Sequence, residues 1–502
     1  MWEPPLRLRC TPGSVNTPAT RRIRGQTALP GRIATERGSV GSVHVVVIGG
    51  DAAGMSSASQ IKRKLGESVE IVVVNEQDWT SYSACGIPYW VAGEVADGPE
   101  ALVARSPEEH RSRGIDVRSR VRATAIDPVA QVVTAVSVDA PADEQQLAYD
   151  HLIIATGAAP LTPPIPGIDL PGVHRVHTLD NGLTAIDALA ESPRTAVVVG
   201  AGFIGLEMAE ACVMRGLATT VLDLAPEPMA VMDPDMGTLI REAMSDHGAD
   251  FRGDEPATEF VAGADGTVAA VRTASGEYPA DIVFLGLGVR PRNELAVAAG
   301  LPVGDSGGIA IDDHCRVVGT TNIWAGGDCV ENYHRISDRP AYVPLGTHAN
   351  KHGRVIGLNI SGLDVTFPGI LGTAITKFMD TEIARVGLSE QQAIDLGLNP
   401  VTATITSRTK PGYFPGSSPI SVKVVAGSPE CRLLGYQIVG GPGSGKRIDT
   451  AAAALWSGMT ATDVVDVDLS YAPPFSLVWD PVQVAARRVM AARDLRCLTP
   501  PD

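Results

Sequence analysis

The fold of this chain is decided by one stretch near its start, Val45-Val46-Val47-Ile48-Gly49-Gly50-Asp51-Ala52-Ala53-Gly54. Its apolar half predicts a buried strand, and its glycines predict a tight turn into a helix that begins near Ala52. A second apolar strand over residues 70–74 closes a βαβ unit. Such a unit presents the N–H groups of its helix start to a dinucleotide pyrophosphate. The stretch therefore predicts a dinucleotide-binding domain.

This first turn departs from the pattern GxGxxG at one place, because Asp51 occupies the position of the second glycine. Glu76 follows Gly49 by 27 residues, where a strand-end carboxylate accepts the hydroxyls of an adenosine ribose. The alternative is a strand–helix turn that binds no ligand. The predicted cofactor contacts of this unit are Gly49, Gly50, Ala53, Gly54 and Glu76.

A second glycine turn, Gly200-Ala201-Gly202-Phe203-Ile204-Gly205, follows the pattern strictly. Asp223 ends the next strand, and a carboxylate there favours a ribose without a phosphate. No arginine stands within residues 224–229 to bind a 2′-phosphate. We therefore expect NADH, with NADPH as the alternative. The predicted contacts are Gly200, Gly202, Ile204, Gly205, Asp223 and Gly288.

Two further strand ends carry the residues expected at a flavin. Residues 152–157 predict a buried strand that ends in a tight turn, and residues 322–328 predict another that ends at Asp328. Asp328 is placed to bind the ribityl chain or the pyrophosphate linker of FAD, and the alternative is a structural strand-end carboxylate. The predicted contacts are Ala155, Thr156, Gly157, Gly327 and Asp328.

Cys85 lies in a polar segment, residues 81–89, that follows the first βαβ unit and leads into an expected helix. The N–H groups of that helix start are expected to lower the pKa of the thiol, which favours a redox role over a buried inert cysteine. The chain has seven cysteines without CxxC spacing, which excludes a local redox dithiol and a recognisable zinc set. We therefore expect no metal. The odd, unpaired count favours a reducing cytoplasm.

Composition limits the classes of partner. The formal charge of −16 argues against nucleic acid, and no apolar run reaches the roughly 18 residues that cross a bilayer. Residues 1–42 hold seven arginines, no lysine and two acids. Prolines interrupt this segment, so we expect a disordered or misassigned leader, with a transit signal as the alternative. Past residue 365, alternating strands and helices predict a separate α+β domain.

These motifs together resemble the single-cysteine branch of the pyridine nucleotide–disulfide oxidoreductases, which includes the coenzyme A disulfide reductases. The most specific matches lie in residues 81–89, 344–354, 446–449 and 471–481. The resemblance implies an α/β fold with two Rossmann-like, glutathione-reductase-like domains for FAD and NAD(P)H and a C-terminal α+β dimerisation domain. It also implies a homodimer in which the tail of one subunit completes the active site of the other.

The domains expected from this resemblance follow one another along the chain. They are a leader (1–42), the first part of the FAD domain (43–160), the NAD(P)H domain (161–285), the second part of the FAD domain (286–364), the dimerisation domain (365–490) and a tail (491–502).

The resemblance also assigns roles to single residues. Cys85 becomes the nucleophile that forms a mixed disulfide with coenzyme A. Tyr413 and Tyr471 stand in rigid turns where a packing role is the simpler interpretation, but they match two tyrosines that assist the thiol chemistry. The residues expected to hold coenzyme A are Ser56, Gln60, Arg63, Ser81 and Asn350.

Two departures bear on the reaction. Relatives that reduce oxygen or peroxide carry a histidine where this chain has Ala52, and Ala84 replaces an asparagine that contacts coenzyme A. We therefore predict a cytoplasmic NAD(P)H-dependent flavoenzyme that reduces coenzyme A disulfide or a related persulfide or polysulfide. The alternatives are an NADH oxidase or peroxidase that uses a Cys85 sulfenate, and a redox-sensing flavoprotein with little turnover.

Overall fold

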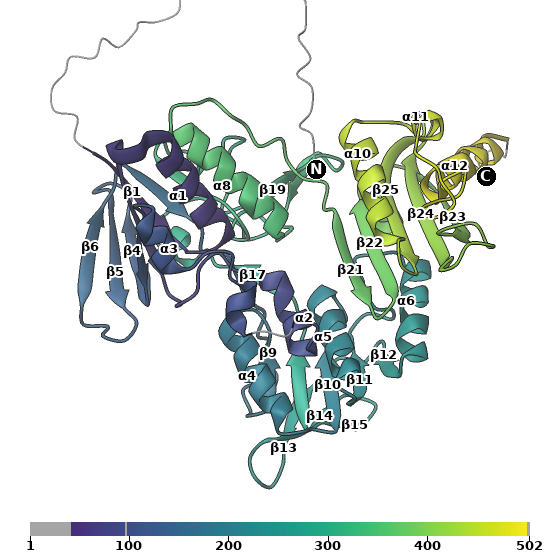
Figure 1. Cartoon of the computed structure of the whole chain (residues 1–502), viewed down its shortest axis with the longest axis horizontal. Helices are drawn as coiled ribbons and strands as arrows, with labels where there is room; N and C mark the ends of the chain where they lie inside the picture. Colours follow the sequence, from purple (N-terminus) through teal and green to yellow (C-terminus); the bar gives the residue numbers. More distant parts are fainter. Residues whose placement is uncertain (1–41, 96–97, 499–502) are drawn as a thin grey trace, which may run out of the picture. The chain divides into compact units, whose positions relative to one another are not determined.

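The computed structural model describes residues 42–95 and 98–498, all within one compact unit that begins at Ser42 (Figure 1). The predicted leader, except for Ser42, lies outside the described residues, as does the end of the predicted tail. None of the described helices is both long enough and apolar enough to pass through a membrane.

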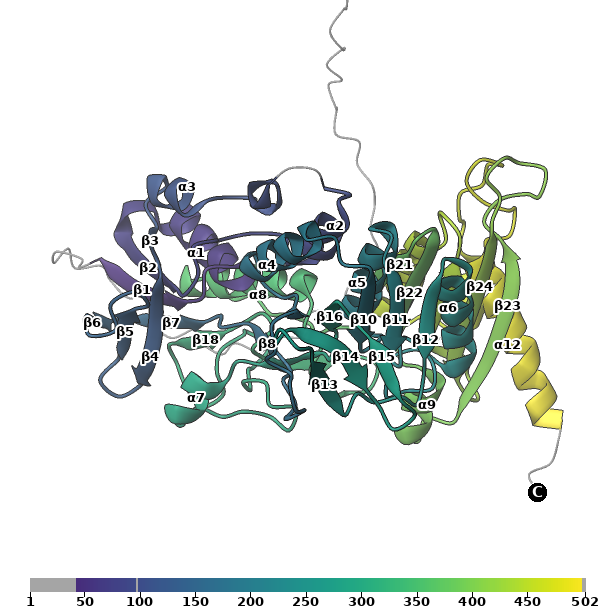
Figure 2. The ribbon, with the colours of Figure 1, turned by 90° about the horizontal axis from the view of Figure 1, so that it is seen from below.

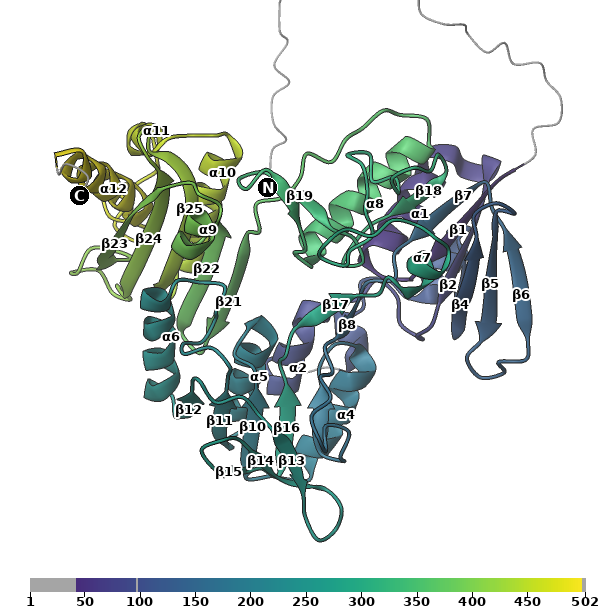
Figure 3. The ribbon, with the colours of Figure 1, turned by 180° about the vertical axis from the view of Figure 1, so that it is seen from behind.

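The first sheet is parallel and has the strand order β18 (Ile323–Ala325), β7 (His151–Ile154), β1 (Val43–Ile48), β2 (Val69–Asn75) and β3 (Asp116–Ser119). Both of its faces are covered, which is why β1 is apolar at successive positions. Helices α1 (Ala52–Leu65) and α8 (Gly346–Ile360) lie side by side on one face (Figures 1 and 3). A smaller sheet of β4 (Val121–Asp127), β5 (Val132–Ser137) and β6 (Glu144–Ala148) packs on the other.

The second sheet repeats this plan and has the order β12 (Ala249–Arg252), β11 (Ala218–Leu222), β10 (Thr195–Val199), β16 (Ile282–Leu285) and β9 (Val173–Arg175). One face packs against α4 (Leu179–Ala190), α5 (Phe203–Met214) and α6 (Pro234–Asp246). The other packs against β13 (Glu259–Ala262), β14 (Val268–Arg272) and β15 (Glu277–Pro279). Strands β8 (Ala158–Pro160) and β17 (Val289–Pro291) pair antiparallel where the chain leaves the first sheet and returns to it.

The third sheet is antiparallel, with the order β21 (Ala374–Phe378), β22 (Thr381–Gly387), β25 (Arg432–Gly440), β24 (Pro419–Gly427) and β23 (Pro400–Arg408). Helices α10 (Ile448–Trp456), α11 (Ala461–Asp466) and α12 (Pro481–Leu498) complete this α+β part, and α12 lies beside β23 and β24 (Figure 2). Strands β24 and β25 are buried at seven successive positions each, because both faces of the sheet are covered.

The remaining helices and strands are short and connect these layers. They are α2 (Ile87–Ala92), α3 (Pro107–Ser112), α7 (Glu294–Ala298), α9 (Glu390–Asp395), β19 (Asn332–His334) and β20 (Arg339–Ala341). The predicted fold class, two dinucleotide-binding folds followed by an α+β part, is confirmed.

Candidate active site

The first glycine turn lies directly against the end of β7. Gly49 has φ +112°, and a Cβ on it would lie 2.1 Å from the carbonyl oxygen of Ala155. No other residue type fits this approach, because an L side chain would collide with the backbone of the neighbouring strand. The turn and the strand end therefore meet at one edge of the sheet, where a parallel sheet binds its ligands.

A cavity of about 300 Å³ opens at this edge. Seven of the predicted cofactor contacts line it: Gly49, Gly50, Glu76, Ala155, Thr156, Gly157 and Asp328. Beneath the turn, Ala53 and Gly327 pack on each other, since a Cβ on Gly327 would lie 3.1 Å from the Cβ of Ala53. A Cβ on Gly157 would meet nothing within 4 Å, so the cavity is open on that side. This glycine-lined cradle fits a flavin dinucleotide.

Two half-buried carboxylates, Asp51 and Asp328, line this cavity. Burial raises the pKa of Asp51 to about 6, against the hydrogen bond from Tyr82, and the charge of Asp328 raises it further. Burial likewise raises the pKa of Asp328 to about 6. The Asp51 carboxylate accepts a hydrogen bond from the backbone N–H of Tyr82 at 3.2 Å. Asp51, which breaks the glycine pattern, thus joins the turn to the segment that carries Cys85.

Glu76 lies between two arginines that sequence reasoning missed. Its carboxylate oxygens are 2.9 Å from Nε of Arg122 and 3.4 Å from a terminal nitrogen of Arg292. Both arginines line the cavity, and Arg292 reaches it from the chain beyond β17. Spacing along the sequence could not reveal this group, because Glu76 and Arg292 are 216 positions apart.

Cys85 sits in a short 3₁₀ turn, Ala84–Gly86, immediately before α2, and its side chain is exposed. The expectation that the start of the helix lowers the pKa of this thiol is wrong, because the surrounding protein raises it. Although the residue is exposed, the protein atoms around its sulfur partly desolvate the thiol and raise the pKa of Cys85, and the carboxylates of Glu207 and Asp328 raise it further. Four other cysteines, Cys212, Cys315, Cys329 and Cys431, are free and buried, and none of them pairs with Cys85.

Glu207 is a second group that the sequence did not single out. It lies on α5 and accepts hydrogen bonds from Thr376 Oγ1 at 2.8 Å and from Tyr89 Oη at 3.4 Å. Burial raises the pKa of Glu207 to about 7 and that of Tyr89 to about 12. This junction joins the helix behind Cys85, the helix of the second glycine turn, and β21. Its one sequence signal is a glutamate two residues after Gly205.

The second glycine turn is held by its own strand-end carboxylate. Asp223 accepts hydrogen bonds from the backbone N–H groups of Ala201 and Ala225. A Cβ on Gly202 would meet nothing within 4 Å, so the space in front of this glycine is open. Ile204 is half-buried on α5, and Gly288, with φ +88°, precedes β17. The open face at Gly202 fits the pyrophosphate of a second dinucleotide.

The residues predicted to hold coenzyme A fall into three places. Ser56 on α1 donates to Asn350 Oδ1 on α8 at 2.8 Å. One helical turn further, Arg63 donates to Gln60 Oε1 at 2.8 Å. Ser81 lies apart from these pairs, on the Cys85 segment, with its Oγ 3.0 Å from a buried histidine. The α1–α8 surface thus presents polar groups, while the role of each in binding stays a prediction.

Tyr413 and Tyr471 stand on the C-terminal sheet domain and are 76% and 46% exposed. Within the described part of the chain, no hydrogen bond links either phenol to Cys85. Exposed aromatic side chains of this size are typical of surfaces that another protein covers. Their role in thiol chemistry stays a prediction.

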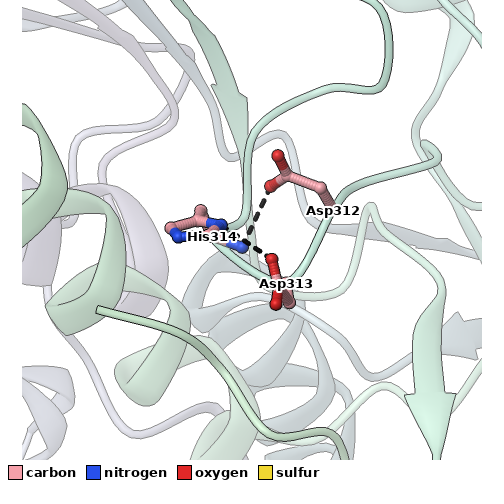
Figure 4. Close-up of side chains that lie close together, drawn as sticks. All are labelled: Asp312, Asp313 and His314. Carbon is pink, nitrogen blue, oxygen red and sulfur yellow. Dashed lines mark hydrogen bonds and ion pairs between the residues drawn. The ribbon is translucent and has the colours of Figure 1, made fainter. Parts of the chain in front are cut away.

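One cluster outside this site has the composition of a metal site, Asp312, Asp313 and His314 (Figure 4). Both ring nitrogens of His314 contact carboxylates, Nδ1 with Asp313 at 2.7 Å and Nε2 with Asp364 at 2.8 Å. The hydrogen bond with Asp364 raises the pKa of His314 most, and the contact with Asp313 raises it further. Because carboxylates already contact both ring nitrogens, this cluster is explained by interactions among its own side chains.

The chain belongs to the pyridine nucleotide-disulphide oxidoreductase family, whose model matches residues 43–352. The dimerisation domain of the same family matches residues 373–481. Family membership makes the chain a FAD-dependent oxidoreductase that uses NAD(P)H, in agreement with the two glycine turns.

Three proteins with known or named activities are similar to this chain over most of its length. The CoA-dependent NAD(P)H sulfur oxidoreductase of Pyrococcus furiosus is 38% identical over 88% of this chain and 98% of its own length. An NADH oxidase of Methanocaldococcus jannaschii is 34% identical over 88% of this chain and 98% of its own. The solved structure of an NAD-dependent persulfide reductase from A. fulgidus is 37% identical, with a TM-score of 0.86 over 90% of this chain and 84% of that one.

Proposed function

We propose that this enzyme reduces coenzyme A disulfide, or a coenzyme A persulfide or polysulfide, through Cys85 as its single redox-active cysteine. The observation that carries the proposal is one exposed thiol beside the flavin cavity, whereas Cys212, Cys315, Cys329 and Cys431 are buried. An enzyme without a resolving cysteine must take the second sulfur of its disulfide from the substrate. The CoA-dependent relative and the persulfide reductase structure support this substrate class.

Cys85 acts on the disulfide as a thiolate. Its sulfur attacks one sulfur of the substrate, one thiolate leaves, and the other half stays bound as a mixed disulfide. The glycine-lined cavity would hold FAD, which would supply the electron pair of the nicotinamide hydride. Two-electron reduction of the mixed disulfide releases the second thiolate and restores the Cys85 thiolate.

Proton transfer is assigned to the C-terminal sheet domain of a second copy. Each departing thiolate needs a donor, and Tyr413 and Tyr471 are exposed phenols that can supply it. The enzyme is accordingly a homodimer in this proposal, in which each tail completes the neighbouring site. The matched dimerisation domain supports that arrangement. We place the enzyme in the cytoplasm, where the substrate thiols are kept reduced.

Several residues of the α1–α8 surface would hold the substrate. Ser56 and Asn350 form one polar pair, and Gln60 with Arg63 forms the other. Arg63 supplies a permanent positive charge, which suits the phosphates of coenzyme A. The domain limits predicted above, from 43–160 to 365–490, are part of the same proposal.

Asp223 sets the preference for NADH. Its carboxylate stands where the ribose of the nicotinamide dinucleotide would bind, and a 2′-phosphate there would meet a negative charge. Arg252, whose backbone carbonyl accepts a hydrogen bond from the Asp223 N–H, has its guanidinium already paired with Asp250 at 2.8 Å. NADPH is therefore expected to bind more weakly than NADH.

The rival reaction is oxygen or peroxide reduction, since one relative is named an NADH oxidase. Ala52 opposes it, because a methyl group cannot transfer the protons that a histidine there would transfer. The deciding experiment measures NADH consumption by the FAD-loaded enzyme in two conditions, one with coenzyme A disulfide as acceptor and one with oxygen alone. Mass spectrometry then gives the mass of the intact protein.

An adduct of the mass of coenzyme A on Cys85, with thiol release, supports the proposal. Sulfenic acid on Cys85 with rapid oxygen consumption refutes it in favour of an oxidase. A reduced enzyme that turns over no acceptor favours the redox sensor. As a control, Cys85→Ser should keep FAD and reduce artificial quinone acceptors, but lose disulfide turnover.

A further inference from the structure

Ser81, four residues before Cys85, has an unusual backbone and a buried partner. Its φ of +49° lies in the left-handed region that favours glycine. The segment is held there by two backbone bonds, Ser81 N–H to the Gly50 carbonyl at 3.2 Å and Ala104 N–H to the Ser81 carbonyl at 2.9 Å. A serine kept in this conformation between the flavin turn and the reactive thiol points to a use for its side chain.

The partner is His110, at the C-terminal part of α3. Its side chain is 0% exposed, and its Nε2 lies 3.0 Å from Ser81 Oγ. Its Nδ1 is buried and has no hydrogen-bond partner among the described residues. Burial, together with the charges of Arg105 and Arg113, lowers the pKa of His110 to about 4. The imidazole is therefore neutral at physiological pH and carries one N–H.

The unpartnered Nδ1 decides where that proton sits. If Nδ1 carried it, a buried N–H would have no acceptor, and such orphaned donors are rare in folded proteins. We therefore assign the Nε2–H tautomer, which donates to Ser81 Oγ. A serine oxygen that accepts this bond keeps its own O–H as a donor, and no described residue accepts it.

We propose that buried His110 is a positioning residue that sets the Ser81 hydroxyl to donate a hydrogen bond to the phosphorylated thiol substrate of Cys85. The substrate class rests on the proposed function above. Among the charged groups that act on the imidazole, Arg105 and Arg113 outnumber Glu109, and this excess of positive charge suits an anionic ligand. His110 would act on binding through Ser81 and would not touch the substrate.

The test measures affinity for coenzyme A by calorimetry, in the FAD-loaded Cys85→Ser enzyme, where no mixed disulfide forms. His110→Phe and Ser81→Ala should each weaken binding about tenfold, the effect of one hydrogen bond. The double variant should bind no more weakly than the worse single one, because both remove the same bond. His110→Gln, which keeps an N–H donor, should restore most of the affinity.

A matched control is His174→Phe, because His174 also has a buried, unpartnered ring nitrogen but lies on β9 of the second sheet. It should leave coenzyme A affinity unchanged. Flavin content checks folding of each variant, and His110→Met replaces His110→Phe if the latter loses FAD.

Two results overturn the inference. One is unchanged affinity in the His110 variants, and the other is a double variant whose losses multiply. If the Cys85→Ser reference itself binds no coenzyme A, the proposed function fails, and this inference fails with it. The two failures are thus distinguished by the reference enzyme alone.

Discussion

Buried His352 on α8 should make the FAD-binding part of the enzyme acid-labile. Its Nδ1 accepts a hydrogen bond from the backbone N–H of Gly327 at 3.1 Å, and its ring packs edge-on against Phe367. Burial first, and then the neighbouring His348 and Lys351, lowers the pKa of His352 from 6.5 to about 3. The neutral ring therefore supports the turn that carries Asp328.

Proton linkage gives the direction and the size of the change in unfolding free energy with pH. The unfolded chain binds a proton at His352 near pH 6.5, whereas the folded protein does so near pH 3. The stabilisation is present above pH 6.5 and is lost progressively as the pH falls toward 3. Between pH 7 and pH 5 this single group should remove about 2 kcal/mol of unfolding free energy.

The assay is urea unfolding of the FAD-loaded enzyme at pH 7 and pH 5, followed by flavin fluorescence. His352→Gln is the matched variant, because an amide oxygen can accept the Gly327 N–H without titrating. Other titrating groups, such as Asp51 and Asp328, contribute equally to both proteins and cancel in the comparison. The variant should lose about 2 kcal/mol less than the wild type on acidification. Equal losses in both proteins would refute the reasoning.

Three further outcomes are expected. Gly202→Ala should raise the KM for NADH about tenfold while FAD content stays normal, because its Cβ would meet only ligand; a normal KM contradicts this site. Lys377→Met should lower the unfolding free energy by about 3 kcal/mol, since it leaves Glu210, 2% exposed, without its cation; adding Glu210→Gln should recover most of that loss in the same unfolding assay. Tyr413→Phe and Tyr471→Phe should each lower disulfide turnover about 100-fold but leave quinone reduction intact, and unchanged disulfide kcat would remove the phenols from the mechanism.

Much of the site could be predicted because it depends on local sequence. Each glycine turn needs a strand, a positive φ and a helix start within about ten residues. The turns at residues 45–54 and 200–205 can therefore be recognised from the sequence. Cys85 was visible because it stood alone in a polar segment. The carboxylates Glu76, Asp223 and Asp328 were found because strand ends meet at one edge of a parallel sheet.

What stayed hidden depends on contacts between distant segments. Arg292 beside Glu76, Thr376 beside Glu207 and His110 beside Ser81 have no shared periodicity or spacing. The pKa of Cys85 was mispredicted for the same reason, because carboxylates from two other segments and the burial around the thiol outweigh its own short helix.

The amino-acid sequence by itself determined the two nucleotide folds, the place of the candidate thiol Cys85 and the antiparallel C-terminal part, because backbone conformation and burial leave short-range patterns. Only the tertiary structure decided the charge around Cys85, the two arginines at Glu76 and the buried histidine behind Ser81. Electrostatic interactions depend on the distance between groups and on their burial, and the order of the residues in the sequence gives neither quantity.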